Sequence, residues 1–125
     1  VLAIAAAKLG ASRVVAIDND PDAVTIAVEN ATRNRVDVHT SAADVADPGL
    51  GSFDVVVANI LPHVLIDLSD ALLGRLATRG ALVLSGIIRE KADDVATHFA
   101  SAGLRVAAID TQGDWVCVRC ERPDA

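Results

Sequence analysis

The sequence lacks several kinds of feature, and each absence excludes a class of protein. Its 125 residues include 2 cysteines, too few for a disulfide framework, so we expect a reducing, cytoplasmic setting. No apolar run is long enough to cross a bilayer, and no segment has the pattern of a signal peptide. Acidic residues outnumber basic ones, and the net charge of −6 argues against a nucleic-acid backbone as a ligand.

Aromatic residues make up only 2% of the chain, and methionine is absent. The core must therefore be built from Ala, Val, Leu and Ile, within a hydrophobic fraction of 52% that is typical of one compact domain. Residues 1–9 have the composition of a buried helix, yet no N-cap residue precedes them. Together with the missing methionine, this start predicts that the chain is a fragment of a longer protein.

Helix and strand signals alternate along the chain. Asp20 and Pro21 indicate a helix start, because Asp caps helices and Pro is tolerated at the first helical position. Gly10 and Gly103 indicate helix ends, where a left-handed conformation favours glycine. The near-continuous apolar run 14–17 suits a strand covered on both faces. The predicted helices are residues 1–9, 20–34, 64–77 and 90–102, and the predicted strands are residues 13–18, 36–40, 53–58, 81–84, 104–110 and 115–121.

This order of elements predicts an α/β fold, a mostly parallel sheet with helices on both faces and right-handed crossovers. The last two strands are joined by Thr111-Gln112-Gly113, a connection short enough for an antiparallel hairpin. No linker or change in composition divides the chain. We therefore interpret residues 1–125 as a single domain that is incomplete at its N-terminal side.

Ligands of open α/β sheets bind beyond the carboxyl ends of the strands, and Asp18 ends the first predicted strand. Its carboxylate could accept two hydrogen bonds from a ribose diol, or it could serve the turn before the next helix. A glycine-rich phosphate loop normally lies about 20 residues before such an acid. That position falls before Val1, so we expect the first strand and its glycine-rich loop to be missing.

Other polar residues follow the remaining strands. Asn59 ends the strongest strand, and its carboxamide could hold a substrate amine or a cofactor carboxylate, or it could cap the next helix. Asp44 could reach an adenine amino group or be a solvated loop residue. Ser85 ends another strand. His63 is the only histidine near this edge, and a helix-start or surface role suits it better than a general base.

The sequence offers no metal site and no nucleophile. Cys117 and Cys120 match Cys-x-x-Cys, but residues three apart on a strand point to opposite faces, and no second pair completes a zinc site. His39 and His98 have no second ligand at metal spacing. We therefore predict no covalent catalysis and assign no catalytic residue.

Several short motifs follow one another in an order known from one family. Ile17-Asp18-Asn19-Asp20-Pro21 is common to many methyltransferases, whereas Asn59-Ile60-Leu61 and Ser85-Gly86-Ile87 are more particular. Further matching segments are residues 1–11, 29–31, 54–58, 82–84 and 113–116. The chain thus resembles the class I S-adenosylmethionine-dependent methyltransferases and, among them, the ribosomal protein L11 methyltransferases.

This resemblance implies a Rossmann-like sheet of seven strands whose last hairpin is antiparallel. It implies that Asp18 binds the ribose of S-adenosylmethionine and that Asn59 lies beside the methionine moiety and the incoming amine. The implied reaction transfers the sulfonium methyl group to lysine and N-terminal amines of ribosomal protein L11. An in-line displacement of this kind mainly needs alignment, so no dedicated nucleophile is expected.

The resemblance also implies parts that this chain does not contain, namely the glycine-rich loop and a separate N-terminal recognition domain. We therefore expect the chain alone to fold poorly, bind cofactor weakly and be inactive. Pro62-His63 has no assigned role. Three alternatives remain: another class I methyltransferase with a different amine substrate, a nicotinamide-dependent dehydrogenase that uses Asp18 for ribose, and a cofactor-free α/β interaction module.

Overall fold

A computed structural model describes residues 2–11, 14–18, 20–42, 45, 47–60 and 62–123. The chain forms two compact units, which we call the N-terminal unit (Val1–Asp47) and the C-terminal unit (Pro48–Ala125). Three residues singled out in the sequence, Asn19, Asp44 and Leu61, lie outside the described residues.

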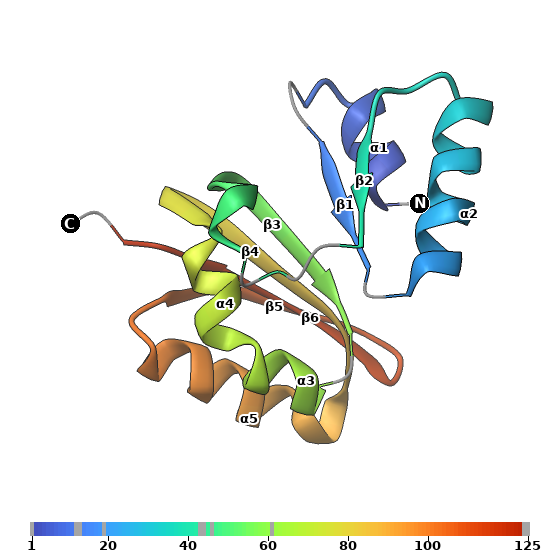
Figure 1. The fold of residues 1–125 in the computed structure, drawn as a ribbon. Coiled ribbons are helices and arrows are strands. Elements are labelled where there is room, and N and C mark those ends of the chain that lie inside the picture. The colour runs from blue at the N-terminus through green and yellow to red at the C-terminus, as the bar shows by residue number, and fades with distance from the viewer. Residues whose placement is uncertain are drawn as a thin grey trace. The chain divides into compact units, whose positions relative to one another are not determined.

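The N-terminal unit contains two helices and a pair of parallel strands (Figure 1). Asp20 caps the second helix as predicted, because its Oδ1 accepts a hydrogen bond from the Asp22 N–H at 3.0 Å. Pro21 occupies the first helical position, as expected for a residue without an N–H to satisfy. The elements are α1 (Leu2–Lys8), β1 (Val15–Ile17), α2 (Pro21–Arg33) and β2 (His39–Ser41).

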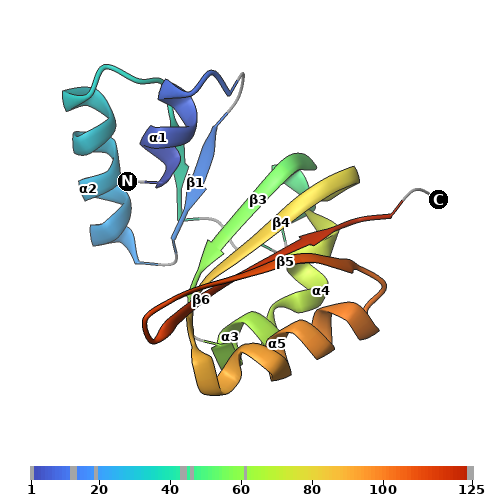
Figure 2. The same cartoon turned by 180° about the vertical axis from the view of Figure 1, so that it is seen from behind.

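The C-terminal unit is built on a four-stranded sheet with the order β3-β4-β6-β5 (Figures 1 and 2). Its elements are η1 (Pro48–Leu50), β3 (Phe53–Asn59), α3 (Pro62–Asp67), α4 (Ser69–Gly74), β4 (Leu76–Ile88), α5 (Arg89–Ser101), β5 (Arg105–Gln112) and β6 (Trp115–Glu121). Strands β3 and β4 are parallel, and β6 is antiparallel to both β4 and β5. This arrangement confirms the α/β fold with a C-terminal antiparallel hairpin.

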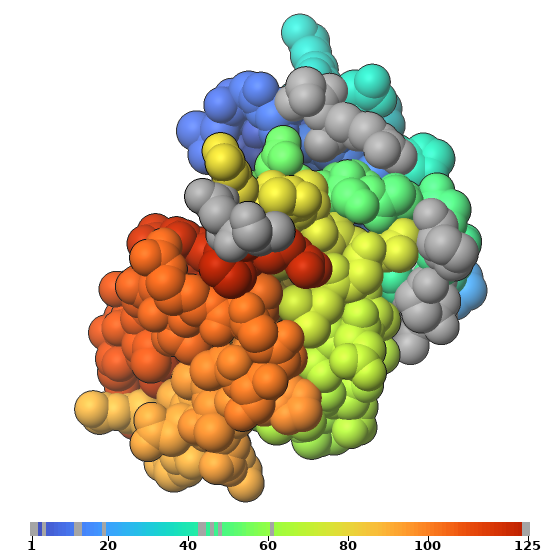
Figure 3. Space-filling model, turned by 90° about the vertical axis from the view of Figure 1, so that its left-hand side faces the viewer, coloured from blue at the N-terminus to red at the C-terminus, as the bar shows by residue number. Residues whose placement is uncertain are grey.

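Helices α3, α4 and α5 cover one face of this sheet in both ribbon views, and Figure 3 shows them forming one continuous surface. The core lies between these helices and the strands. Its largest fully buried side chains are Phe99, Leu65, Leu82, Leu84, Ile87, Val95, Val118 and Cys120. On the opposite face, the side chains of Val55 and Val57 are 57% and 47% exposed.

Two elements of the C-terminal unit differ from their predicted extents. The helix predicted over residues 64–77 is broken at Leu68 into α3 and α4, and it ends at Gly74. The strand predicted over residues 81–84 extends over 13 residues, because β4 is hydrogen-bonded to β3 on one side and to β6 on the other. The turn predicted at residues 78–80 lies inside β4, where Arg79 has a φ of +62°.

The strands do not form one continuous sheet. The described residues contain six strands, arranged as a two-stranded sheet in one unit and a four-stranded sheet in the other. The resemblance implied seven strands in a single sheet. Within the described part of the chain, β1 pairs only with β2, and β3 pairs only with β4. One long edge of β1 and one of β3 therefore carry no strand partner in these two sheets.

Candidate functional site

Asp18 lies directly after β1 and is exposed. Its backbone N–H donates to the Ser41 carbonyl oxygen at 3.1 Å, which continues the pairing of β1 with β2. Its Oδ1 accepts a hydrogen bond from the Asp20 N–H at 2.9 Å. One carboxylate oxygen therefore stabilises the turn before α2. This is one of the two roles predicted for Asp18, the other being to bind a ribose diol. The other oxygen can accept a hydrogen bond from a ligand, and the fixed turn holds it at the carboxyl end of β1.

Asn59 is the last residue of β3 and lies in register with Ser85 on the parallel strand β4. Its side chain is exposed, and its Oδ1 lies against the backbone of Gly86. Helix α3 begins at Pro62, so position 61 rather than Asn59 precedes the helix. The predicted alternative, in which Asn59 caps this helix, therefore does not describe its position. The carboxamide is instead presented at the carboxyl end of β3, beside Gly86 of β4, a strand that continues to Ile88.

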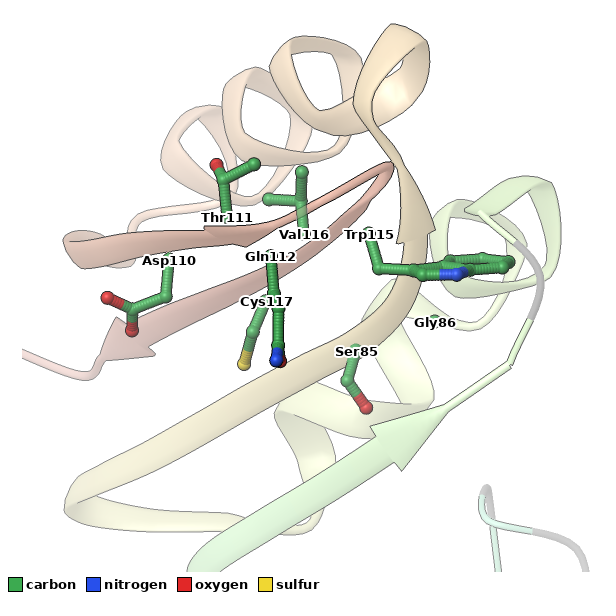
Figure 4. A pocket seen from close by; sticks show the side chains of 8 residues that line it. All are labelled: Ser85, Gly86, Asp110, Thr111, Gln112, Trp115, Val116 and Cys117. Carbon is green, nitrogen blue, oxygen red and sulfur yellow. The ribbon is translucent and has the colours of Figure 1, made fainter.

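A pocket of about 400 Å³ lies beside this point, between β4 and the β5–β6 hairpin (Figure 4). Because β6 runs antiparallel to β4, the hairpin end of the sheet adjoins the carboxyl end of β4. Ser85, Gln112 and Cys117 point to the same side of the sheet in Figure 4, whereas Thr111 and Val116 point to the other side. The lining residues are Ser85, Gly86, Asp110, Thr111, Gln112, Trp115, Val116 and Cys117.

Ser85 was predicted to end a strand, but it lies inside β4, which continues to Ile88. The hairpin residues Asp110 and Gln112 were not predicted to lie beside it. The available signal was the polar run 110–112 at the tip of a predicted hairpin. This polar run can be placed beside Ser85 only once the pairing of β6 with β4 is known. This pairing connects residues about 30 positions apart, and no local pattern specifies it.

The histidines and cysteines among the described residues do not form a cluster beside the pocket. His63 is exposed in the first turn of α3, whereas the His98 Nε2 lies 2.9 Å from the Ser69 Oγ among the helices. Cys120 is fully buried, and burial raises the pKa of its thiol from 9.0 to about 11. Cys117 lines the pocket on the other side of β6. No group of three His, Cys, Asp or Glu side chains among the described residues could hold a metal ion.

The helices are short. None of those in the described residues combines the length and the apolar character that a membrane crossing needs.

Comparison with solved structures defines the class of the fold. The crystal structure of a ribosomal protein L11 methylase from Lactobacillus delbrueckii subsp. bulgaricus superposes with a TM-score of 0.91 at 34% identity, covering 97% of this chain and 64% of that chain. An RNA methyltransferase from Salinibacter ruber in complex with S-adenosyl-L-homocysteine gives a TM-score of 0.75 at 21% identity, covering 99% of this chain and 74% of that one. The fold is that of the class I methyltransferases.

The family follows from the sequence comparisons. The chain belongs to the ribosomal protein L11 methyltransferase (PrmA) family, whose model matches residues 1–123. It is 43% identical over 118 residues to the ribosomal protein L11 methyltransferase of Geobacter metallireducens, covering 94% of this chain and 39% of that protein. The Dechloromonas aromatica relative is 45% identical over 123 residues, covering 98% of this chain and 40% of that protein. The chain thus spans about two fifths of the length of these relatives.

Proposed function

We propose that these residues belong to an S-adenosylmethionine-dependent N-methyltransferase that methylates lysine and N-terminal amines of ribosomal protein L11. The observation that carries this proposal is the family match, which extends over residues 1–123. The similarity to relatives named for this activity supports it.

We also propose that both units are parts of one catalytic domain, and that the protein works in the cytoplasm. Two free thiols, Cys117 and Cys120, are in keeping with a reducing compartment.

In this proposal Asp18 binds the ribose of the cofactor. A carboxylate can accept hydrogen bonds from both hydroxyls of a ribose, and here one of its oxygens has no partner among the described residues. The hydrogen bond from the Asp20 N–H orients the carboxylate before any ligand arrives. Asp20 in turn is fixed as the cap of α2, so the helix start supports the geometry of the binding residue.

Asn59 lies beside the methionine moiety of the cofactor and the incoming amine in this proposal. Its carboxamide carries both a donor and an acceptor, so it can orient an amine whose lone pair must face the methyl group. S-adenosylmethionine supplies the sulfonium methyl group that the amine nitrogen takes. The contribution of the protein is alignment and the exclusion of other geometries, which explains why no side-chain nucleophile is required.

The test uses the complete gene product that carries this chain, incubated with S-adenosylmethionine and purified ribosomal protein L11. Mass spectrometry of the product counts the methyl groups and locates them on lysine or N-terminal amines. Asp18→Ala is expected to weaken S-adenosylhomocysteine binding at least about tenfold, which corresponds to about 1.4 kcal/mol. Asn59→Ala is expected to lower the rate of methyl transfer by a similar factor or more.

Matched controls are available on β3 itself and beside β2, the partner strand of β1. Asp37→Ala removes an exposed carboxylate just before β2, and Asp54→Ala removes one near the amino end of β3, so both should leave binding and turnover unchanged. Unmodified L11 together with methylation of a different amine substrate would contradict the assigned substrate. Unchanged cofactor affinity in Asp18→Ala and unchanged turnover in Asn59→Ala would contradict the assigned site.

A further inference from the structure

Strand β4 is irregular where it passes Asn59. Its pairing with β6 shifts register between Leu84, which lies opposite Val118, and Ile87, which lies opposite Val116. Two residues of β4, Ser85 and Gly86, therefore face a single residue of β6. An extra residue of this kind bends a strand and redirects its neighbours, and such bulges often adjoin functional sites. Gly86 has a φ of +75° at this bend, a conformation that favours glycine.

Gly86 also lies against the side chain of Asn59. A Cβ atom added to Gly86 would lie 2.2 Å from the Asn59 Oδ1, far closer than two such atoms can approach. The contact follows from the register, because Asn59 pairs with Ser85 and its side chain extends over the next residue of β4. No hydrogen bond within the described residues holds the Asn59 carboxamide. Its Oδ1 therefore occupies space that a side chain at position 86 would need.

Two other glycines with positive φ in the same unit differ in this respect. Gly103 (φ +101°) and Gly113 (φ +61°) have open space where a Cβ would stand. An alanine at Gly103 would meet the same kind of backbone strain as an alanine at Gly86, without touching another side chain. Backbone conformation explains a glycine at all three positions, and the contact with Asn59 is an additional requirement at Gly86.

From this geometry we infer that Gly86 is a positioning residue, which acts through Asn59 by leaving the space that its carboxamide occupies at the carboxyl end of β3. This inference rests on the proposed function, since it concerns the residue assigned to the incoming amine. It predicts that any side chain at position 86 displaces the carboxamide and lowers activity as removal of the carboxamide is expected to do.

The experiment compares Gly86→Ala, Asn59→Ala and the double variant in the complete gene product. Activity is expressed per folded molecule, with the folded fraction taken from circular dichroism. Gly86→Ala should lower kcat/KM at least about tenfold, with the same division between kcat and KM as Asn59→Ala. The double variant should be no less active than Asn59→Ala, because the second substitution removes a group that the first has already displaced. Gly103→Ala is the control, expected to lose stability but to retain activity per folded molecule.

The possible outcomes separate the inference from the proposed function. Full activity in Gly86→Ala alongside a large loss in Asn59→Ala would overturn the inference and leave the proposed function standing. Losses that add in the double variant would also overturn it, since Gly86 would then act independently of Asn59. Full activity in Asn59→Ala would overturn the site assignment, and the inference with it.

Stability provides a second readout. Because the Asn59 carboxamide is the end of an exposed side chain, it can move away from the new methyl group, so Gly86→Ala should lose about as much stability toward urea as Gly103→Ala, which has the same kind of backbone strain. A much larger loss in Gly86→Ala that Asn59→Ala restores would show that the carboxamide stays in place instead of being displaced, and would overturn the inference.

Discussion

The two units of the chain differ in how their structure is maintained. In the N-terminal unit Ala31 is buried, while Ile26 and Val28 of α2 are 56% and 46% exposed. The C-terminal unit holds the large side chains that are described as fully buried, such as Phe99 and Leu65, and it has its own layer of helices. A two-stranded sheet is marginal by itself, whereas three or more strands packed against helices are stable. We therefore expect core packing to dominate the stability of the C-terminal unit. In the N-terminal unit, helix caps and other local interactions should contribute a larger share of the stability.

The largest effect should come from the core of the C-terminal unit. Phe99 of α5 is fully buried, so Phe99→Ala should lower the free energy of unfolding by about 3–5 kcal/mol. Ile26→Ala, on the exposed side of α2, should change it by less than about 0.5 kcal/mol. Urea unfolding followed by circular dichroism and by the fluorescence of Trp115 measures both. Equal losses in the two variants would show that the contrast between the units is wrong.

A smaller effect should appear at alkaline pH in the same core. Burial raises the pKa of the Cys120 thiol from 9.0 to about 11, so the unfolded chain ionises first as the pH rises. The stability present below pH 9 should therefore decrease toward pH 11, by at most about 2–3 kcal/mol. Urea unfolding between about pH 8 and about pH 11 measures this decrease. It should be absent in Cys120→Ala and retained in Cys117→Ala.

The smallest effect concerns the N-terminal unit. Asp20→Ala removes the acceptor for the Asp22 N–H and should destabilise α2 by about 1 kcal/mol. Asp20→Ser keeps an acceptor at the cap and should lose much less. Amide hydrogen exchange in α2 measures the change, and the exchange of β4 and β6 should stay as it was. A response of β4 equal to that of α2 would mean that the units do not differ in this way.

Local signals predicted the parts of the fold that depend on neighbouring residues. Asp20 and Pro21 predicted the start of α2, and Gly103 predicted the end of α5. Both predictions succeeded because helix caps involve residues only a few positions apart. The length of β4 was missed, since it depends on pairing with β3 and β6 at the same time. The break at Leu68 was missed too, because the regular spacing of leucines continues through it.

The candidate site shows the same division. Asp18 and Asn59 could be selected from sequence, because a polar residue at the end of an apolar strand is a local pattern. The space that Gly86 leaves for Asn59 depends on the register of β3 against β4 together with the bulge against β6. Neither appears in a one-dimensional pattern, and the family resemblance identified Ser85-Gly86-Ile87 without giving a reason for it.

The position of β6 has a consequence for how the protein is made. This strand comes last among the described strands, yet it lies between β4 and β5 in the sheet. While the chain is being synthesised, β4 and β5 emerge first and cannot complete their hydrogen bonding to the strand that separates them. The sheet can close only after residues 115–121 have left the exit tunnel, so nascent chains stalled before that point would expose a strand edge to chaperones.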